Sequence, residues 1–148
     1  MSMNRPSKLK YYLDIAAAVA ARSTCLRRQY GAVIVKDDMI ISTGYNGSAR
    51  GWLNCCDLGE CWRESHKIPH GQQYEKCRAV HAEANAIISA SRLDMMGATL
   101  YLAGFENGER IENPEPCEMC QRMIENAGIV HVRTNESQEI VALGGIQS

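Results

Sequence analysis

The spacing of apolar residues divides the first third of the chain into a helix and a β-hairpin. Between residues 7 and 25 apolar side chains recur three or four positions apart, which predicts a helix, and Pro6 suits its entry. Gly31–Val35 is a β-branched run typical of a buried strand. Asp37 and Asp38 then turn the chain, and Met39–Tyr45 returns as a second strand. The apolar residues of the predicted helix are Leu9, Tyr12, Ile15, Ala16, Val19 and Ala20.

The second half of the chain alternates helices and strands. Residues 79–92 are rich in alanine and place an apolar stripe on one side, which predicts a helix. Cys117–Ala127 is predicted as a further helix that Gly128 ends, in the position after its C-terminus. A polar, glycine-containing loop is predicted over residues 103–115. Apolar runs predict the strands Ala98–Leu102, Ile129–Arg133 and, at a sheet edge, Glu139–Leu143.

The order of these elements, α-β-β-α-β-α-β-β, predicts an α/β fold. We expect a three-layer α/β/α sandwich around a central mixed sheet of about five strands. The helices at 79–92 and 117–127 are expected side by side on one face of that sheet. The chain shows no internal repeat or linker, and its length of 148 residues suits one domain over residues 1–148.

Composition and charge narrow the classes of function. Hydrophobic residues make up 45% and charged residues 22% of the chain, as in ordinary globular proteins. The formal net charge of −1 argues against nucleic acid as a partner, because polyanion binding needs a basic face. We expect no membrane span, since no apolar run approaches about 18 residues, and no signal peptide. With 7 cysteines and no secretory signal, we expect metal-binding thiols in a reducing cytosol, and hence a cytoplasmic protein.

Two short segments contain the side chains of a catalytic zinc site. A helix that begins near His81 places His81 and Glu83 in its first turn, and a helix that begins near Cys117 places Cys117 and Cys120 in its own. The positive end of the second helix favours thiolates there. Three protein ligands on Zn²⁺ leave the fourth tetrahedral position open for water. Glu83 beside the metal is placed to shuttle protons.

The combination of the two segments is more specific than either alone. Cys-x-x-Cys also occurs in redox motifs and structural metal half-sites, and His-x-Glu alone carries little information. In this order, with Pro116 before the first cysteine, they match H-x-E…P-C-x-x-C, the known signature of zinc nucleobase deaminases. The alternative is a closed four-ligand zinc site with Glu83 in solvent, but neither segment holds an obvious fourth ligand.

Five stretches carry a resemblance to a known family: CLRR at 25–28, GAVIV at 31–35, ISTGYNG at 41–47, HAEANAI at 81–87 and PCEMC at 116–120. They resemble the deoxycytidylate (dCMP) deaminases of the zinc-dependent cytidine deaminase superfamily and cover most of residues 20–130. HAE and PCxxC are shared by the whole superfamily, whereas ISTGYNG followed by HAExNAI is more particular to dCMP deaminases. Two features depart from the family: the loop before PCEMC is longer than in many members, and Ala49 stands where many carry proline.

The resemblance implies a cytidine-deaminase-like fold and the hydrolytic deamination of dCMP to dUMP and ammonia, which feeds thymidylate synthesis. Zinc on His81, Cys117 and Cys120 is expected to lower the pKa of a water molecule toward neutrality, and water adds to C4 of the cytosine. Glu83 takes the proton of the water, delivers it to N3 and later protonates the departing amine, since one group must act as base and then as acid. The expected small-molecule partner is the nucleotide substrate.

The resemblance also implies substrate contacts. The backbone N–H of Ala82 is expected to help hold the base, and Asn46 to bind the sugar or the base edge. Asn46 is flanked by glycines that allow a ligand to approach closely, although the same residues also suit a plain loop. Asn85 is either a substrate contact or a structural bracket. Arg92 follows His81 by eleven residues, about three helical turns, and is therefore expected on the same face of the predicted helix. It contacts a phosphate or a neighbouring subunit, or else it lies in solvent at a helix end, where it complements the helix dipole.

Residues 47–76 are predicted to form a functional or metal-stapled loop, because the stretch is rich in Gly, Cys, His, Trp and charge. The resemblance implies a second, structural zinc here, in addition to the catalytic ion. Thiolate-rich zinc would keep such a weakly apolar loop ordered; the other interpretation is that these thiols bind no metal. The candidate ligands are Cys25, Cys56, Cys61 and Cys77, with Cys55 as a substitute for Cys56 and His66 or His70 as substitutes for a thiol.

Two other functions stay open. One is a related deaminase that acts on another cytosine nucleotide, a nucleoside, a base or tRNA adenosine; the lack of basic clusters argues against tRNA, and the GYNG stretch against a nucleoside. The other is a non-catalytic, zinc-stabilised nucleotide-binding module, which has no need of Glu83 beside an open zinc. Family members are commonly hexamers activated by dCTP and inhibited by dTTP. The resemblance therefore implies a homo-oligomer, with a hexamer as one candidate, and regulation of this kind.

Overall fold

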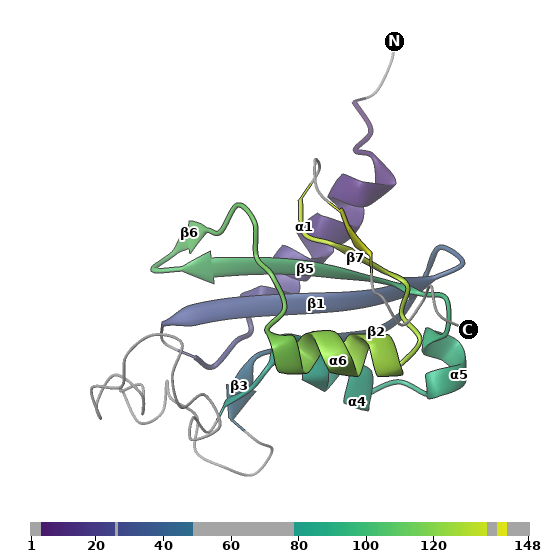
Figure 1. Cartoon of the computed structure of the whole chain (residues 1–148). Helices are drawn as coiled ribbons and strands as arrows, with labels where there is room; N and C mark the ends of the chain where they lie inside the picture. The colour runs from purple at the N-terminus through teal and green to yellow at the C-terminus, as the bar shows by residue number, and fades with distance from the viewer. Residues whose placement is uncertain (1–3, 26, 49–78, 136–138, 142–148) are drawn as a thin grey trace.

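A mixed β-sheet forms the middle layer of the protein (Figure 1). The structure, a computed structural model, describes residues 4–25, 27–48, 79–135 and 139–141. The strands of the sheet are β1 (Arg28–Lys36), β2 (Met39–Tyr45), β5 (Thr99–Glu106), β6 (Glu109–Arg110), β7 (His131–Arg133) and β8 (Glu139–Val141). A separate pair is formed by β3 (Gly47–Ser48) and β4 (Ala79–Val80). The helices are α1 (Lys8–Ala20), α4 (Ala82–Ile88), α5 (Arg92–Met95) and α6 (Glu118–Asn126).

The strands follow the order β2-β1-β5-β7-β8, and β6 pairs with the end of β5. β1 is antiparallel to both β2 and β5, β5 is parallel to β7, and β7 is antiparallel to β8. The parallel pair is joined through α6, as a parallel connection requires a crossover element. The predicted mixed sheet of about five strands is confirmed, with β6 as a short addition.

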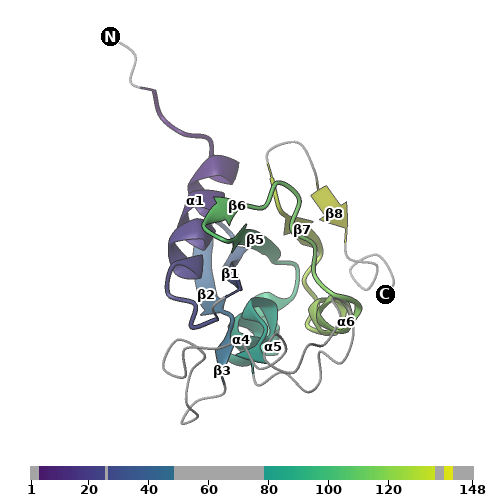
Figure 2. The ribbon, with the colours of Figure 1, turned by 90° about the vertical axis from the view of Figure 1, so that its left-hand side faces the viewer.

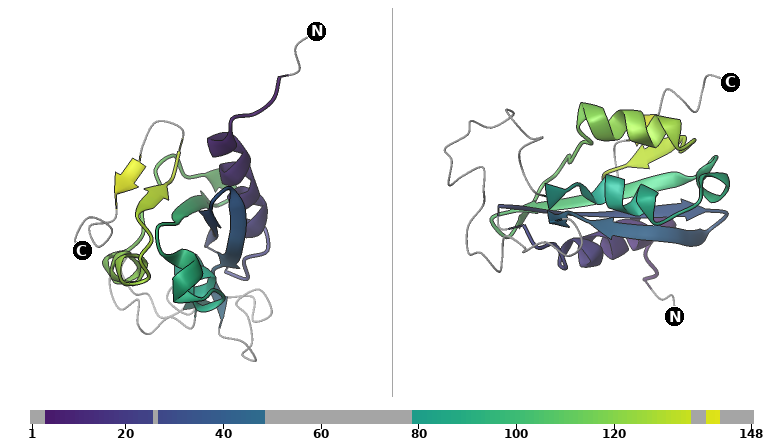
Figure 3. Two further views of the ribbon diagram at one scale, coloured as in Figure 1. Left: turned by 90° about the vertical axis from the view of Figure 1, so that its right-hand side faces the viewer. Right: turned by 90° about the horizontal axis from the view of Figure 1, so that it is seen from below.

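Helices cover both faces of the sheet (Figures 2 and 3). On one face, α1 packs on β1 and β5, and the cluster between them contains Tyr12, Ala16, Val33, Val35 and Ala103. On the other face, α4, α5 and α6 enclose a larger cluster, whose biggest members are Ile34, Leu100, Leu102, Ile124, Ile129 and Val132. The predicted three-layer α/β/α sandwich is confirmed, and α4 and α6 contact each other on one face as expected.

The first helix is shorter than its apolar pattern predicts. Ser7 caps its N-terminus by accepting a hydrogen bond from the Lys10 N–H at 3.1 Å, and Ala21 ends it four residues before Cys25. Ser23 lies beyond the helix because its hydroxyl donates to the Asn46 carbonyl at 2.7 Å. Tertiary contacts with the end of β2 thus replace the last predicted turn.

The predicted turn at Asp37 and Asp38 is confirmed. Both residues have positive φ, 52° and 61°, as a tight two-residue hairpin turn requires. The second hairpin was not predicted: instead of a loop over residues 103–115, β5 continues to Glu106 and turns at Asn107 and Gly108, with φ of 53° and 81°, into β6. Asn-Gly is a strong hairpin signal, and it identifies this turn.

The prediction of one helix over residues 79–92 is wrong. α4 begins after His81 and ends at Ile88, and a second helix, α5, begins at Arg92. The break occurs because Ser91 acts as a new N-cap, with its hydroxyl accepting from the Asp94 N–H at 3.3 Å. Arg92 therefore does not share a helix face with His81.

Among the residues that the structure describes, no helix has the length and apolar character needed to cross a membrane.

Candidate metal centre and active site

The first turn of α4 presents a histidine and a glutamate. His81 is the N-cap residue in extended conformation, and its side chain makes no capping hydrogen bond. Glu83 lies in the first helical turn and is only 5% exposed. The prediction that both side chains belong to one helix start is confirmed, and both lie near Cys120.

The first turn of α6 presents both thiols. Cys117 is its N-cap, and its sulfur accepts a hydrogen bond from the Cys120 N–H at 3.4 Å. Cys120 is fully buried, whereas Cys117 is half-buried. Because the unpaired N–H groups at a helix start favour a negative sulfur, this turn suits thiolate ligands.

Three side-chain atoms from the two helices converge as metal ligands do. The Nδ1 atom of His81 lies 3.5 Å from the sulfur of Cys117 and 3.3 Å from that of Cys120. The ligand atoms of the three residues all lie within 4.8 Å of one another. Tetrahedral zinc, with bonds of about 2.3 Å to sulfur and about 2.0 Å to nitrogen, places such atoms about 3.5 Å apart. The donor set and its spacing therefore fit a zinc ion.

The protonation of Cys120 also depends on a cation. Burial raises the pKa of its thiol, and the nearby charges of Glu83 and Cys117 raise it further. With its pKa raised in this way, the Cys120 thiol keeps its proton when no cation is near. A divalent cation reverses this balance, because a coordinating thiol loses its proton.

Glu83 lies beside the ligand cluster. Burial raises the pKa of its carboxyl group, and the backbone N–H of its own residue, the charge of His81 and a hydrogen bond with Cys120 partly oppose this shift. A carboxyl group with a raised pKa is closer to the range in which it can both take and give a proton near neutral pH.

The strand β2 fixes α4 against the sheet. The Ser42 hydroxyl donates to the Ala86 carbonyl at 2.7 Å, and the Asn85 side chain donates to the Tyr45 carbonyl at 2.8 Å. Gly44 permits the contact, since a Cβ there would lie 2.4 Å from the Ala86 nitrogen. The sequence analysis did not predict a role for Ser42. The pattern that could have indicated one is a polar residue at an inward-facing position of a predicted strand. For Asn85, the contact supports the structural bracket.

Asn46 joins β2 to the start of β1. Its Oδ1 accepts from the Tyr30 N–H at 2.7 Å, and its Nδ2 donates to the Arg28 carbonyl at 2.8 Å. An amide side chain has two donor hydrogens and two acceptor lone pairs, and among the described residues the Asn46 side chain uses one of each. Ala82, the first residue of α4, has a backbone N–H with no acceptor inside the helix, as expected at this position.

Arg92 is not brought to the ligand cluster. Its Nε donates to the carbonyl of Asn126, the last residue of α6, at 3.2 Å. A cation at a helix C-terminus complements the helix dipole, which supports the helix-end role of Arg92.

Most candidate ligands of the predicted second zinc site lie outside the described residues. Cys25 is half-buried just before β1, with its carbonyl accepting from the Gln29 side chain at 2.6 Å. The other candidate ligands, Cys56, Cys61 and Cys77, lie outside the described residues, as do the substitutes Cys55, His66 and His70.

The family model for the cytidine and deoxycytidylate deaminase zinc-binding region matches residues 6–135. The fold and the ligand cluster agree with a zinc-binding deaminase domain. The chain belongs to the cytidine and deoxycytidylate deaminase family.

Within this family, the chain is similar in sequence and structure to individual deoxycytidylate deaminases. The chain is 40% identical over 134 residues to the deoxycytidylate deaminase of Mycobacterium phage D29, covering 88% of this chain and 95% of the phage protein. It is 35% identical over 130 residues to the deoxycytidylate deaminase of Schizosaccharomyces pombe, covering 86% of this chain but 37% of the yeast protein. The crystal structure of apo dCMP deaminase from the cyanophage S-TIM5 is similar, with a TM-score of 0.61, 25% identity, and coverage of 90% of this chain and 87% of the other.

Proposed function

We propose that this protein is a zinc-dependent deaminase that converts dCMP and water to dUMP and ammonia. The observation that carries the proposal is the convergence of His81, Cys117 and Cys120 beside the buried carboxyl group of Glu83. Family membership and the 40% identity with a phage deoxycytidylate deaminase support dCMP as the substrate.

In this proposal the first turns of α4 and α6 hold the zinc ion. His81 contributes Nδ1, and Cys117 and Cys120 contribute their sulfur atoms. Zinc bound there supplies a Lewis acid that lowers the pKa of water toward neutrality. α4 is fixed to β2 through Ser42 and Asn85, and α6 contacts α4, so the three ligands are held together for one ion.

Glu83 moves the protons. Its carboxylate takes a proton from water as the oxygen adds to C4 of the cytosine ring, and it delivers that proton to N3. It then takes the remaining proton of the added hydroxyl group and passes it to the amine, so that the C4–N4 bond breaks and ammonia leaves. Burial of Glu83 and its raised pKa suit this change from base to acid within one turnover.

Further contacts of the substrate are part of the proposal. The N–H of Ala82, which has no acceptor inside its own helix, is suited to hold the base. The second donor hydrogen and lone pair of the Asn46 amide are suited to contact the base edge or the sugar. Asn85 and Arg92 stay predicted substrate residues, but each has a structural partner, in Tyr45 and Asn126.

Four broader properties are also proposed, the first two on the family resemblance, the third on the length of the chain and the fourth on its cysteine content. They are a second, structural zinc that includes Cys25, a homo-oligomer with regulation by dCTP and dTTP, a single domain over residues 1–148, and a cytoplasmic location. The half-buried position of Cys25 just before β1 supports the first of these.

The test is ammonia release from dCMP, dCDP, dCTP, deoxycytidine and CMP, measured in parallel on protein of known zinc content. We expect dCMP turnover far above the others and two zinc ions per chain. One zinc per chain would keep the enzyme and remove the structural site. If zinc is bound but no cytosine compound reacts, the dCMP assignment is wrong, and the nucleotide-binding module becomes the better interpretation.

A further inference from the structure

Three polar side chains gather on the sheet face that carries α4 and α6. Along β1, Arg28 and Tyr30 lie on the same face as Ala32, which packs in the core under these helices. On β5, Glu106 is paired with Arg28, and Gly104 with Tyr30. The start of β1 and the end of β5 lie at the end of the sheet where α4 and α6 begin (Figure 1). The three side chains are therefore at the end of the sheet that carries the active site.

Tyr30 is held in one position. Its backbone N–H donates to Asn46 Oδ1 at 2.7 Å, and its carbonyl accepts from the Asn46 N–H at 3.3 Å. Its ring lies over Gly104, where a Cβ would come within 2.6 Å of two ring carbons. The Arg28 Nε pairs with a carboxylate oxygen of Glu106 at 3.3 Å, and the charge of Arg28 lowers the pKa of the Tyr30 phenol, against the effect of burial.

These polar groups exceed what packing requires. A phenylalanine would fill the space over Gly104 equally well. The side chains of Arg28 and Glu106 are 31% and 36% exposed, and an ion pair with that exposure adds little to stability. Burial raises the pKa of Tyr30, with the charge of Glu83 among the smaller causes, so the hydroxyl stays protonated at neutral pH. A neutral hydroxyl is thus held within electrostatic range of Glu83.

We propose that Tyr30 is a specificity-determining residue of this active site, and that Arg28 and Glu106 are positioning residues that hold its phenol. The ring and hydroxyl of Tyr30 form the sheet-side wall of the site, against which the pyrimidine ring of the substrate lies. The inference rests on the proposed deamination. Because Tyr30 fills the space that Gly104 leaves, shortening Tyr30 opens room for a pyrimidine with an added methyl group.

The test compares Tyr30→Phe and Tyr30→Ala on dCMP, 5-methyl-dCMP and N4-methyl-dCMP. Tyr30→Phe removes the hydroxyl group from the wall against which the pyrimidine ring lies, and we expect kcat/KM for dCMP to fall about tenfold, mostly through KM. For Tyr30→Ala we expect the ratio of kcat/KM for at least one methylated analogue to kcat/KM for dCMP to rise by about tenfold or more. One added methyl-sized group in a tight pocket changes kcat/KM by about 10–200-fold. Arg28→Lys and Glu106→Gln should change the ratio of analogue to dCMP kcat/KM by a smaller factor. When either is combined with Tyr30→Ala, the double variant should show no larger change than Tyr30→Ala alone.

The matched control is Tyr101→Phe, a tyrosine on β5 that packs on the α1 side of the sheet. For the ion pair, the control is Lys10→Met, which breaks the surface pair with Asp14, 2.7 Å long, on α1. If Tyr30→Phe equals Tyr101→Phe in kcat/KM and Tyr30→Ala leaves the analogue ratio unchanged, the inference is wrong. It is also wrong if the losses follow a loss of bound zinc, because Tyr30 then acts only on folding. Failure of the proposed function is distinct, since the unsubstituted protein would already fail to deaminate dCMP.

Discussion

The two faces of the central sheet bury different kinds of side chain. Under α1, the contact with β1 and β5 is made mainly by small and aromatic apolar residues. Under α4 and α6, an apolar cluster continues to the helix starts, where a carboxyl group and a fully buried thiol enter the interior. Burial of such groups costs free energy unless they are paired. Chemistry is thus confined to the α4 and α6 face, whereas both faces contribute to stability, and variants on the two faces should separate unfolding from turnover.

The largest effect is expected from Glu83→Gln on the α4 face. The amide keeps the shape of the side chain but cannot take a proton, so turnover of dCMP should fall about 10²–10⁴-fold. Zinc content, measured by atomic absorption, should stay unchanged, because Glu83 is not among the converging ligands. Glu118→Gln, an exposed glutamate in the first turn of α6, is the control and should keep full activity. Wild-type turnover in Glu83→Gln would mean that another group moves the protons.

Cys120→Ser should act on the same face through the metal. A hydroxyl is a harder and weaker zinc ligand than a thiolate, and we expect zinc affinity to fall by more than about tenfold, with activity falling alongside it. Competition with a chelator of known affinity measures the change. Met119→Ser, next in the chain and 57% exposed, should retain zinc as the unsubstituted protein does. Full zinc retention by Cys120→Ser would exclude its sulfur as a ligand.

Two glycines provide a direct comparison of the faces. A Cβ on Gly31 would lie 2.0 Å from the Ala16 carbonyl oxygen in α1, and a Cβ on Gly44 would lie 2.4 Å from the Ala86 nitrogen in α4. Each alanine variant must therefore push one helix away from the sheet.

For Gly31→Ala we expect the free energy of unfolding to fall by about 1–3 kcal/mol, with kcat of the folded protein preserved. For Gly44→Ala we expect a similar loss of stability and, in addition, at least about a tenfold loss of kcat, because α4 carries His81 and Glu83. Urea unfolding and steady-state kinetics on the same samples separate the two quantities. Equal losses of kcat in both variants would contradict the division between the faces.

Local patterns predicted the parts of the site that lie within one segment. The first turns of α4 and α6 follow from capping and spacing, because a thiol or imidazole at the N-cap and the residues after it share one turn. The break at Ser91 escaped prediction because the alanine-rich stripe of residues 79–92 outweighed a single capping serine. The signal was present, since serine with an acidic residue three positions later is typical of a helix start.

Contacts between segments could not be predicted in the same way. Arg28 and Glu106 are neighbours only because β1 and β5 pair in one register, and register is set by the assembled sheet. The family resemblance gave Asn46 a substrate role, yet both hydrogen bonds described for its side chain hold the start of β1. A buried amide in a loop is ambiguous in sequence, because binding and bracing require the same residue.

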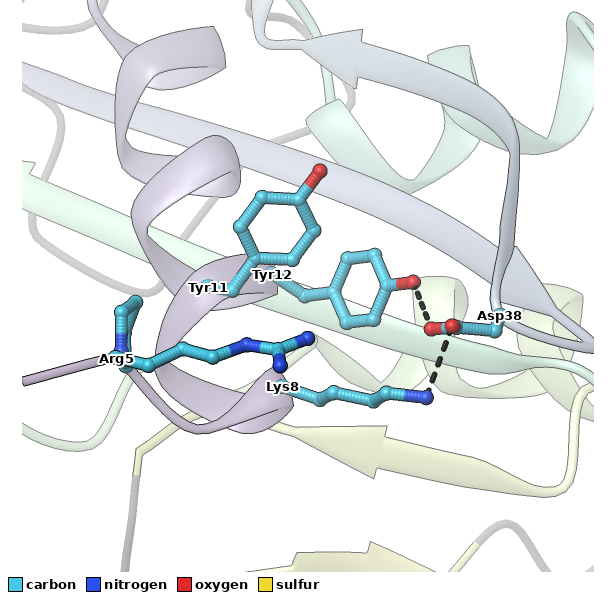
Figure 4. A pocket seen from close by; sticks show the side chains of 6 residues that line it. Arg5, Lys8, Tyr11, Tyr12 and Asp38 are labelled. Atoms are coloured by element: carbon cyan, nitrogen blue, oxygen red, sulfur yellow. Dashed lines mark hydrogen bonds and ion pairs between the residues drawn. The ribbon is translucent and has the colours of Figure 1, made fainter. Parts of the chain in front are cut away.

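The smallest effect is expected on the α1 face, from Tyr12→Phe. The Tyr12 hydroxyl donates to Asp38, and Lys8 pairs with the same carboxylate at 2.9 Å (Figure 4). These hydrogen bonds lower the pKa of Asp38 below 3.8, so its stabilisation is present above that pH and is lost as pH falls through the folded pKa. The hydrogen bond to Asp38 and burial raise the pKa of Tyr12 from 10.0 to about 12, so its stabilisation is present below pH 10.0 and is lost as pH rises through about 12.

Between about pH 4 and pH 10, the melting temperature of Tyr12→Phe should therefore lie a few degrees at most below that of the unsubstituted protein. The difference should become smaller below and above this pH range. Thermal unfolding followed by circular dichroism from pH 3 to 11 measures this profile. Tyr11→Phe, a tyrosine on the same helix that is 49% exposed, is the control and should give no such profile. Turnover of dCMP should be unchanged in both variants, since α1 lies across the sheet from Glu83. A loss of turnover in Tyr12→Phe without a loss of stability would show that the α1 face is coupled to the chemistry, and the two faces would then not be independent.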